Sequence, residues 1–312
     1  MIFKRNEVHV SKKRYSPDLV FTGQDVSFFY TYIRKNASTS FKLLFQELYP
    51  DACPGDLPSL RCMAQHVLVT ELEPEEIDRR FATKLFVYRD PIERVFSVYK
   101  NKLIQMDGAK DLLKRLEKVV GRDPALLTFD EFVHEYVVLL ETERWEEVDG
   151  HLYPQVWHLL PITYNKVIRM GNAYQEMREL LPKELCDKVF KEPSNSTTKG
   201  STPLAFCDPD CPAIYFRKKY ARAKALPTLQ QVLTPATEAR LRDIYAEDYR
   251  MIEEVEGRPM NEKLALLDGN PTFSLNTDDE GASQSLCCNE GVLTPEQALG
   301  LDFSLPEDAP KH

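Results

Sequence analysis

The chain has 312 residues, of which 43% are hydrophobic, so it can bury the core of one large α/β domain or two small ones. The formal net charge is −9, and residues 257–312 hold most of it, with ten acidic against three basic residues. The rest of the chain is near neutral, which argues against a general nucleic-acid-binding protein with its broad basic face. No apolar run reaches the roughly 18–20 residues of a membrane span, and the first residues lack a signal-peptide core. A cytoplasmic protein without a membrane span is therefore expected.

The seven cysteines are odd in number and their spacings form no disulfide framework. We expect them to be reduced, as in a cytosolic protein. Cys207 and Cys211 could close a small disulfide or supply half of a metal site, but no second pair with zinc spacing accompanies them. The sequence predicts no metal.

The first elements in the chain are a strand, a turn and a helix. Residues 1–24 are polar and predict an irregular segment. Residues 26–33 are rich in aromatic and β-branched side chains, which is typical of a buried strand. Small residues follow, and a helix is then predicted by apolar positions at helical spacing, Leu43, Leu44, Phe45 and Leu48. A short second strand is expected at 66–69.

A further strand at 84–88 ends at Arg89, and Asp90 then caps a helix with Pro91 at its first position. Later in the chain we expect helices at 109–119, 129–141, 172–181 and 235–255, and a strand at 166–170. Strands that alternate with helices predict a parallel α/β sheet. Residues 25–256 would form this domain, and 257–312 an acidic, disordered tail.

The turn after the first strand has the composition of an anion site. Ala37, Ser38, Thr39 and Ser40 stand where a strand passes into a helix, and Lys35 precedes them. Unpaired N–H groups and the helix dipole favour an anion there, and the hydroxyls can add donors. The alternative is an ordinary helix capped by Ser or Thr, with Lys35 in solvent. The Walker pattern is absent.

A second anion-binding pattern follows the strand at 84–88. Arg89 ends that strand, and Ser97 lies eight residues further, two turns into the next helix. An arginine fork suits a phosphate monoester because it donates two parallel charged hydrogen bonds. In the alternative reading, Glu93 and Arg94 are surface charges and Ser97 is only a small helix residue.

These motifs resemble those of the sulfotransferases that use 3′-phosphoadenosine 5′-phosphosulfate (PAPS). Lys35-Asn-Ala-Ser-Thr-Ser-Phe41 is similar to the 5′-phosphosulfate loop of the uronyl 2-O-sulfotransferases. Leu85-Phe-Val-Tyr-Arg-Asp-Pro-Ile-Glu-Arg-Val-Phe-Ser97 resembles the 3′-phosphate motif of Golgi carbohydrate sulfotransferases of the chondroitin 4-O and HNK-1 type. His151-Leu-Tyr-Pro-Gln155 and the helix after Leu233 resemble later segments of that group. The chain departs from the pattern at Arg34, at Asn36 and in lacking the membrane anchor.

The resemblance implies a P-loop-like sulfotransferase fold, with a central parallel sheet flanked by helices, and PAPS as co-substrate. The loop from Asn36 through Ala37, Ser38 and Thr39 to Ser40 would hold the 5′-phosphosulfate. Lys35 would stabilise charge on the oxygen that bridges phosphorus and sulfur. Arg89 and Ser97 would hold the 3′-phosphate.

The resemblance also gives a candidate general base for the acceptor. His66 falls where the 2-O-sulfotransferases place a catalytic histidine, and a neutral imidazole can take a hydroxyl proton. A buried structural histidine is the alternative, and His151 is the second candidate base. The basic stretch 217–224 is either a solvated helix face or a cover for the nucleotide or an anionic acceptor.

The predicted activity is transfer of a sulfuryl group from PAPS to a hydroxyl, or an amine, of a carbohydrate or small metabolite. The predicted partners are thus an acceptor and the nucleotide, and no nucleic acid; the oligomeric state stays open. Two alternatives remain. One is a P-loop-type nucleotide phosphotransferase, which the missing Walker and magnesium motifs disfavour. The other is a catalytically inactive relative that still binds nucleotide.

Overall fold

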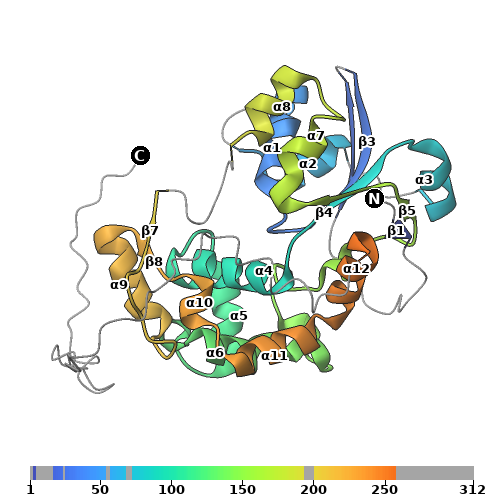
Figure 1. The fold of residues 1–312 in the computed structure, drawn as a ribbon. Coiled ribbons are helices and arrows are strands. Elements are labelled where there is room, and N and C mark those ends of the chain that lie inside the picture. Colours follow the sequence, from blue (N-terminus) through green and yellow to red (C-terminus); the bar gives the residue numbers. More distant parts are fainter. Residues whose placement is uncertain are drawn as a thin grey trace, which may run out of the picture. The chain divides into compact units, whose positions relative to one another are not determined.

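A four-stranded sheet lies at the centre of the fold in the computed structural model, which describes residues 3–4, 17–23, 25–53, 57–67, 72–192 and 200–257 (Figure 1). Its strands, in spatial order, are β2 (Asp18–Gly23), β3 (Val26–Thr31), β4 (Lys84–Tyr88) and β6 (Lys166–Arg169). Strands β3, β4 and β6 are parallel, and β2 pairs antiparallel with β3 at the edge. The predicted α/β fold, with a central and mainly parallel sheet flanked by helices, is confirmed.

The central strands are apolar on both faces because both faces are covered. Tyr30, Leu85 and Val87 point into one core, while Phe29 and Phe86 point into another on the opposite face. This is the two-residue alternation of a strand, and burial on both sides explains the continuous apolar runs in the sequence.

Helices cover the two faces of the sheet in separate sets (Figure 1). The first set is α1 (Ser38–Leu48), α2 (Leu60–Val67), α7 (Ala173–Met177) and α8 (Lys183–Phe190). The second set is α3 (Pro74–Arg80) and α12 (Ala246–Glu256). Phe41 of α1 stacks on Tyr30 of β3 with ring centroids 3.7 Å apart, which fixes α1 directly behind the strand that precedes it.

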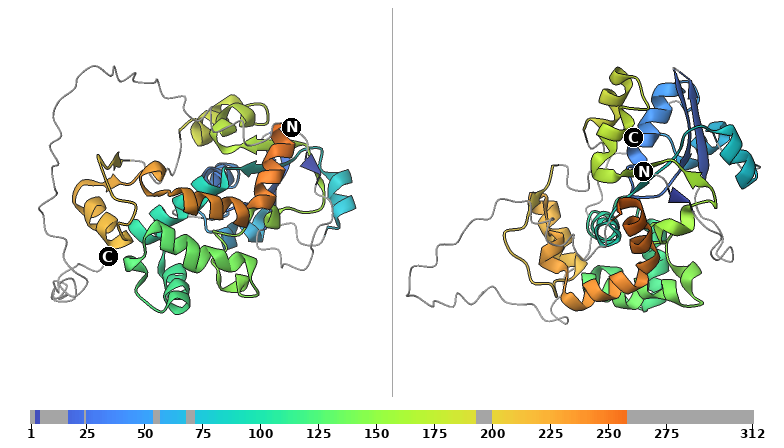
Figure 2. Two further views of the ribbon diagram at one scale, coloured as in Figure 1. Left: turned by 60° about the horizontal axis from the view of Figure 1, so that its bottom comes forward. Right: turned by 45° about the vertical axis from the view of Figure 1, so that its right-hand side comes forward.

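A third core joins the helices that follow β4 to those near the end of the described chain (Figure 2). Its main helices are α4 (Pro91–Val98), η1 (Tyr99–Ile104), α5 (Lys110–Val120), α6 (Phe129–Glu131), η3 (Phe132–Tyr136), η4 (Val137–Glu141), α9 (Ala213–Ala223), α10 (Leu229–Val232) and α11 (Pro235–Ile244). Short elements complete the fold: β1 (Phe3–Lys4), η2 (Pro124–Leu126), η5 (Trp145–Glu147), η6 (Gln155–His158), β5 (Thr163–Tyr164), η7 (Met170–Asn172), β7 (Thr202–Pro203) and β8 (Ala225–Leu226).

The structure differs from the sequence predictions near the N-terminus. The segment 1–24, predicted to be irregular, contains β1 and the edge strand β2. Positive φ at Gly23 (118°) and Asp25 (63°) lets the chain turn tightly from β2 into β3. The predicted strand at 66–69 is wrong where it can be compared, because His66 and Val67 end helix α2 and the next residues lie outside the described part.

Of two later predictions, one is corrected by the structure and the other concerns residues that the structure does not describe. The predicted helix 235–255 is two helices, α11 and α12, which meet at Tyr245. Beyond Gly257, the predicted acidic tail lies outside the described residues. Within the described ranges, none of the helices combines the length and apolar character needed to span a bilayer.

Candidate active site

The loop between β3 and α1 has an unusual backbone and is fixed to the sheet. Lys35 and Ala37 have φ values of 69° and 55°, in the left-handed region that residues with a Cβ rarely occupy. Asn36 between them is fully buried, and its Nδ2 donates to the Val87 carbonyl at 2.9 Å and to Gln155 Oε1 at 2.6 Å. These two hydrogen bonds hold the loop against the end of β4.

Helix α1 begins without the groups that usually neutralise a helix N-terminus. Ala37 is the N-cap, no side chain caps the helix, and the first turn contains no acidic residue. The amides of Ser40 and Phe41 bond to the Ala37 carbonyl, at 2.9 and 3.3 Å. Ser38 and Thr39 are only partly buried, so the first turn can offer its N–H groups and hydroxyls to an anion. The alternative of a helix capped by Ser or Thr is wrong.

The second predicted motif lies beside this loop because β3 and β4 are neighbouring parallel strands whose carboxyl ends meet at one edge. Asp90 caps α4, with its Oδ1 accepting from the Glu93 amide at 3.0 Å, as predicted. Arg89 is partly buried, and its Nε lies 3.3 Å from Glu93 Oε2. Arg89 and Lys35 therefore both follow the carboxyl ends of neighbouring strands, at the same edge of the sheet.

Gln155 joins the two motifs directly. Its Oε1 accepts from Asn36 Nδ2 at 2.6 Å and from the Arg89 amide at 3.0 Å, while its Nε2 donates to the Arg89 carbonyl at 2.9 Å. Asp248 of α12 accepts from the Gln155 and Val156 amides at 2.9 and 3.0 Å. One buried amide therefore sets the spacing between the β3–α1 loop and the β4–α4 junction.

Arg94 anchors the rest of the segment that carries Gln155. It is completely buried, and its guanidinium donates to the carbonyls of His151, at 2.8 Å, and Tyr153. The hydroxyl of Tyr245 donates to the Leu152 carbonyl at 2.6 Å. The alternative reading of Arg94 as a surface charge is wrong: this cation is structural.

Four basic side chains gather around the loop. The pKa of Lys35 is lowered to about 7, by burial first and then by the positive charges of Lys102 and Arg89, which outweigh Asp107. Burial and Arg89 likewise lower the pKa of Lys100 to about 8. Burial also lowers the pKa of Lys102, whose Nζ donates to the Asp107 carbonyl at 2.6 Å. Cations that destabilise one another in this way are typical of a site that receives an anion.

Ser97 is buried within α4, whereas a phosphate ligand has to reach the surface of the site. Its side chain is 2% exposed, and its hydroxyl donates to the Arg94 carbonyl at 2.8 Å. To contact a phosphate, this hydroxyl has to leave the carbonyl and adopt another rotamer. Of the predicted phosphate ligands, the structure brings together Lys35, the 36–40 loop and Arg89 directly.

A histidine–carboxylate pair lies next to the basic cluster. His151 Nδ1 lies 2.6 Å from Asp149 Oδ1. Burial lowers the pKa of His151, with Arg34 and Lys102 adding to the effect and Asp149 opposing it. Although burial opposes it, the hydrogen bonds and charge of His151 lower the pKa of Asp149 to about 2. The pair therefore holds a neutral imidazole beside an ionised carboxylate at neutral pH.

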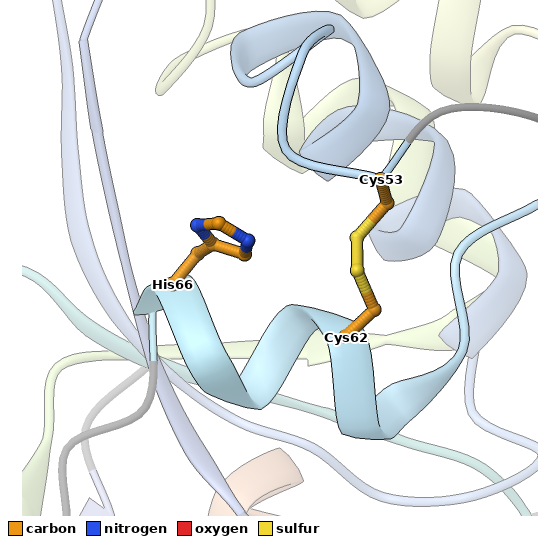
Figure 3. A group of neighbouring side chains, drawn as sticks. All are labelled: Cys53, Cys62 and His66. Carbon is orange, nitrogen blue, oxygen red and sulfur yellow. A yellow bond between two sulfur atoms is a disulfide. The ribbon is translucent and has the colours of Figure 1, made fainter.

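His66 lies near Phe45, which is in the later part of α1. His66 is exposed at the end of α2, and its ring lies 6.0 Å from that of Phe45. Phe45 is two turns along α1 from Ser38, about 10 Å at 1.5 Å per residue. His66 is instead a neighbour of Cys53 and Cys62 (Figure 3).

Cys53 and Cys62 form a disulfide, so the expectation that the cysteines are reduced is wrong for this pair. The two sulfurs and a ring nitrogen of His66 lie within 4.8 Å of one another, but sulfurs in a disulfide are not thiolate ligands for a metal. Cys186, Cys207 and Cys211 are free thiols in the described chain, and Cys207 and Cys211 are not bonded to each other.

Sequence reasoning missed the contribution of the segment after Ser97. Lys100, Asn101 and Lys102 belong to η1, a π-helical turn, and all three side chains are buried. In the sequence they continue the pattern of an α-helix. The one signal that indicates a role in the site is the presence of two lysines so close to the second motif. Farther along, Arg217 opens the basic stretch 217–224, and its Nε donates to the Leu103 carbonyl at 2.5 Å. The basic stretch thus touches the same π-helical turn at one end.

The chain belongs to the sulfotransferase family, whose sequence profile matches residues 17–252. It is similar to human carbohydrate sulfotransferase 14 (Homo sapiens), with 32% identity over 145 residues. That alignment covers 42% of this chain and 36% of the human protein, so the chain spans about a third of the relative's length. No solved structure matches the chain significantly.

Proposed function

We propose that the protein transfers a sulfuryl group from PAPS to a hydroxyl of an acceptor, a carbohydrate in the first instance. The observation that carries this proposal is a set of cations beside a helix N-terminus whose first turn contains no acidic residue. Lys102 and Arg89 destabilise the charge of Lys35, and Arg89 destabilises that of Lys100. A donor with phosphates at both ends and a sulfate would relieve that repulsion. Membership of the sulfotransferase family supports the same donor.

The residues at the sheet edge fit such a donor in two parts. The loop from Asn36 to Ser40 offers the first amides of α1 and the partly exposed hydroxyls of Ser38 and Thr39 to the 5′-phosphosulfate. Arg89, at the neighbouring strand end, suits the 3′-phosphate because its guanidinium can donate two charged hydrogen bonds. Gln155 ties the two parts together.

The reaction is an in-line displacement at sulfur. The acceptor oxygen forms a new S–O bond, and the bond from sulfur to the bridging oxygen breaks, with its electron pair leaving on adenosine 3′,5′-bisphosphate. Lys35 stabilises the charge that grows on this oxygen, an interaction stronger in the transition state than in the ground state. Because the pKa of Lys35 is about 7, its ammonium can also give a proton to the leaving oxygen near neutral pH.

For the acceptor's proton we propose His151 rather than His66. His151 precedes Gln155 by four residues, and the charges of Arg34 and Lys102 act on it, which places it in the same cluster as Lys35. With Asp149 fixing Nδ1 as the protonated nitrogen, Nε2 is the basic one. Because its pKa is lowered, the His151 imidazole is neutral at pH 7 and can accept a proton.

The carbohydrate acceptor follows from the likeness to carbohydrate sulfotransferase 14, and a small-metabolite hydroxyl or amine is the second candidate. The expected cytoplasmic location is not part of the proposal, because a disulfide such as Cys53–Cys62 persists in oxidising compartments. A nucleotide phosphotransferase is disfavoured, since no Walker lysine–serine pair stands in the loop.

Two measurements on the full chain test this function. Adenosine 3′,5′-bisphosphate should raise the melting temperature without magnesium, whereas ATP with magnesium should have little effect. Incubation with radiolabelled PAPS and a panel of glycans, phenols, sterols and amines should label one acceptor class. Stabilisation by ATP–magnesium alone, with no labelled product, would refute the sulfotransferase proposal.

The variant Lys35→Ala separates binding from chemistry. Loss of a preorganised cation at a developing charge should lower turnover by about 10²–10³-fold. Binding of adenosine 3′,5′-bisphosphate should fall much less than turnover, because the loop and Arg89 hold its phosphates and the contribution of Lys35 is largest in the transition state. Turnover equal to that of the wild type would contradict the role of Lys35.

A further inference from the structure

We propose that Asn101 is a positioning residue that holds the Lys35 ammonium at the donor site through a neutral oxygen; this inference rests on the proposed sulfuryl transfer. Asn101 Oδ1 accepts from Lys35 Nζ at 2.6 Å. Asn101 is only 6% exposed, and Lys35 is partly buried. Among the described residues, this is the hydrogen bond that determines where the ammonium lies when the loop holds no ligand.

The π-helical turn and Asp107 fix the direction of the Asn101 amide. Asn101 Nδ2 donates to Asp107 Oδ2 at 2.9 Å, and the Asp107 amide donates back to the Asn101 carbonyl at 3.0 Å. Since the carboxylate can only accept, the amide nitrogen must face Asp107 and the amide oxygen must face Lys35. The result is a chain from Asp107 through Asn101 to Lys35 in which each donor has one acceptor.

A neutral group at position 101 has a specific advantage. The charged groups that face Lys35 are Lys102 from η1, Asp107 from the following turn and Arg89 from the β4–α4 junction. Asn101 stands between Asp107 and Lys35, so within the described part of the chain the ammonium is bonded to a neutral oxygen and not to a carboxylate. A direct charged hydrogen bond would be about twice as strong as one to a neutral amide, and the donor sulfate would have to displace it. Asn101 thus aims Lys35 without neutralising it.

The simplest variant, Asn101→Asp, places two carboxylates side by side at 2.9 Å and could disturb the turn. The exchange N101D/D107N avoids this, because it keeps the number of charges and restores a donor opposite the new carboxylate. The matched control is Asn172→Asp, which makes the same chemical change at an exposed position of η7. Asn101→Ala removes the anchor without adding charge.

The first readout does not depend on activity. The rate at which the Lys35 amine is acetylated, followed by mass spectrometry across pH, gives its pKa in the ligand-free protein. We expect a value near 7 in the wild type and in Asn172→Asp. In N101D/D107N, an adjacent carboxylate should raise it by about 1–3 units. An unchanged Lys35 pKa in the exchange variant would overturn the inference.

The second readout is the pH dependence of kcat/KM for PAPS, which reports groups in the free enzyme. The protonated Lys35 is the active form, so the wild-type rate should fall as pH rises through about 7. In N101D/D107N this fall should move to higher pH, and kcat/KM at pH 6.5 should drop by about tenfold or more. The variant Asn101→Ala should lower kcat about tenfold and retain its affinity for the bisphosphate. If the wild type transfers no sulfate but the acetylation shift is present, the proposed function fails and the contact stands. A pH profile that matches the wild type refutes the positioning role.

Discussion

Replacing Gln155 by alanine should weaken both the fold and nucleotide binding. The side chain is fully buried and makes four hydrogen bonds, to Asn36, to the amide and carbonyl of Arg89, and to Asp248. Asn36 keeps a bond to Val87, and Asp248 keeps the main-chain amides, so the groups left unpaired are the two backbone groups of Arg89.

The magnitude follows from those two groups. An unsatisfied buried donor or acceptor costs about 1–3 kcal/mol. Because Arg89 is only partly buried, water can recover some of this, and we expect Gln155→Ala to lower the free energy of unfolding by about 3 kcal/mol. The β3–α1 loop and the β4–α4 junction would also lose their fixed spacing. The affinity for adenosine 3′,5′-bisphosphate should therefore fall by about 10–100-fold, which corresponds to about 1.4–2.8 kcal/mol.

Urea unfolding followed by circular dichroism gives the first quantity, and titration calorimetry with the bisphosphate gives the second. The matched control is Gln175→Ala, an exposed glutamine in α7, which should change stability by less than about 0.5 kcal/mol. If Gln155→Ala unfolds within 1 kcal/mol of the wild type and binds the bisphosphate equally well, Gln155 does not couple the two motifs.

Two further predictions concern the histidines and the disulfide. His151→Ala should reduce sulfuryl transfer by about 10²–10⁴-fold, which is the usual contribution of a general base. His66→Ala should stay within about twofold of the wild type. A loss of activity confined to His66→Ala would reverse the assignment. Because burial holds the pKa of His151 below its ordinary value, the loss of activity toward acid should set in only below about pH 6.5. Cys53→Ser should lower the free energy of unfolding by about 2–3 kcal/mol, since the disulfide closes a short loop. A reducing agent should destabilise the wild type by the same amount and leave the stability of the variant unchanged. A wild type that unfolds at the same urea concentration with and without reductant would contradict this.

Local signals in the sequence predicted the parts of the fold that depend on local chemistry. The strand predicted at 26–33 and the cap at Asp90 each follow from neighbouring residues, and the structure has a strand at 26–31 and that cap. The turn predicted from Ala37 to Ser40 ends earlier, because Ser38 already begins α1. Edge strand β2 escaped prediction because its apolar run is short and the sequence around it is polar. Helix α2 escaped because it is short and buries only Met63 and Val67, so the sequence shows no long apolar stripe.

The parts of the site that were missed depend on contacts between distant residues. Gln155 meets Asn36 across 119 positions, and no local pattern indicates such a pair. Arg94 looks like any charged helix residue until the His151 segment closes over it. The widened turn that buries Asn101 has no sequence signature, because a π-helix differs from an α-helix only by a shift of one residue in its hydrogen bonds.

The left-handed residues in the β3–α1 loop have a consequence for ligand capture. Many phosphate-binding loops use glycines, which leave the free loop many shapes, whereas Lys35 and Ala37 carry a Cβ and have few. A rigid loop loses little motion when a ligand arrives, so more of each contact contributes to affinity. Its shape is also set before binding, which makes it selective for ligands of one geometry and intolerant of larger ones.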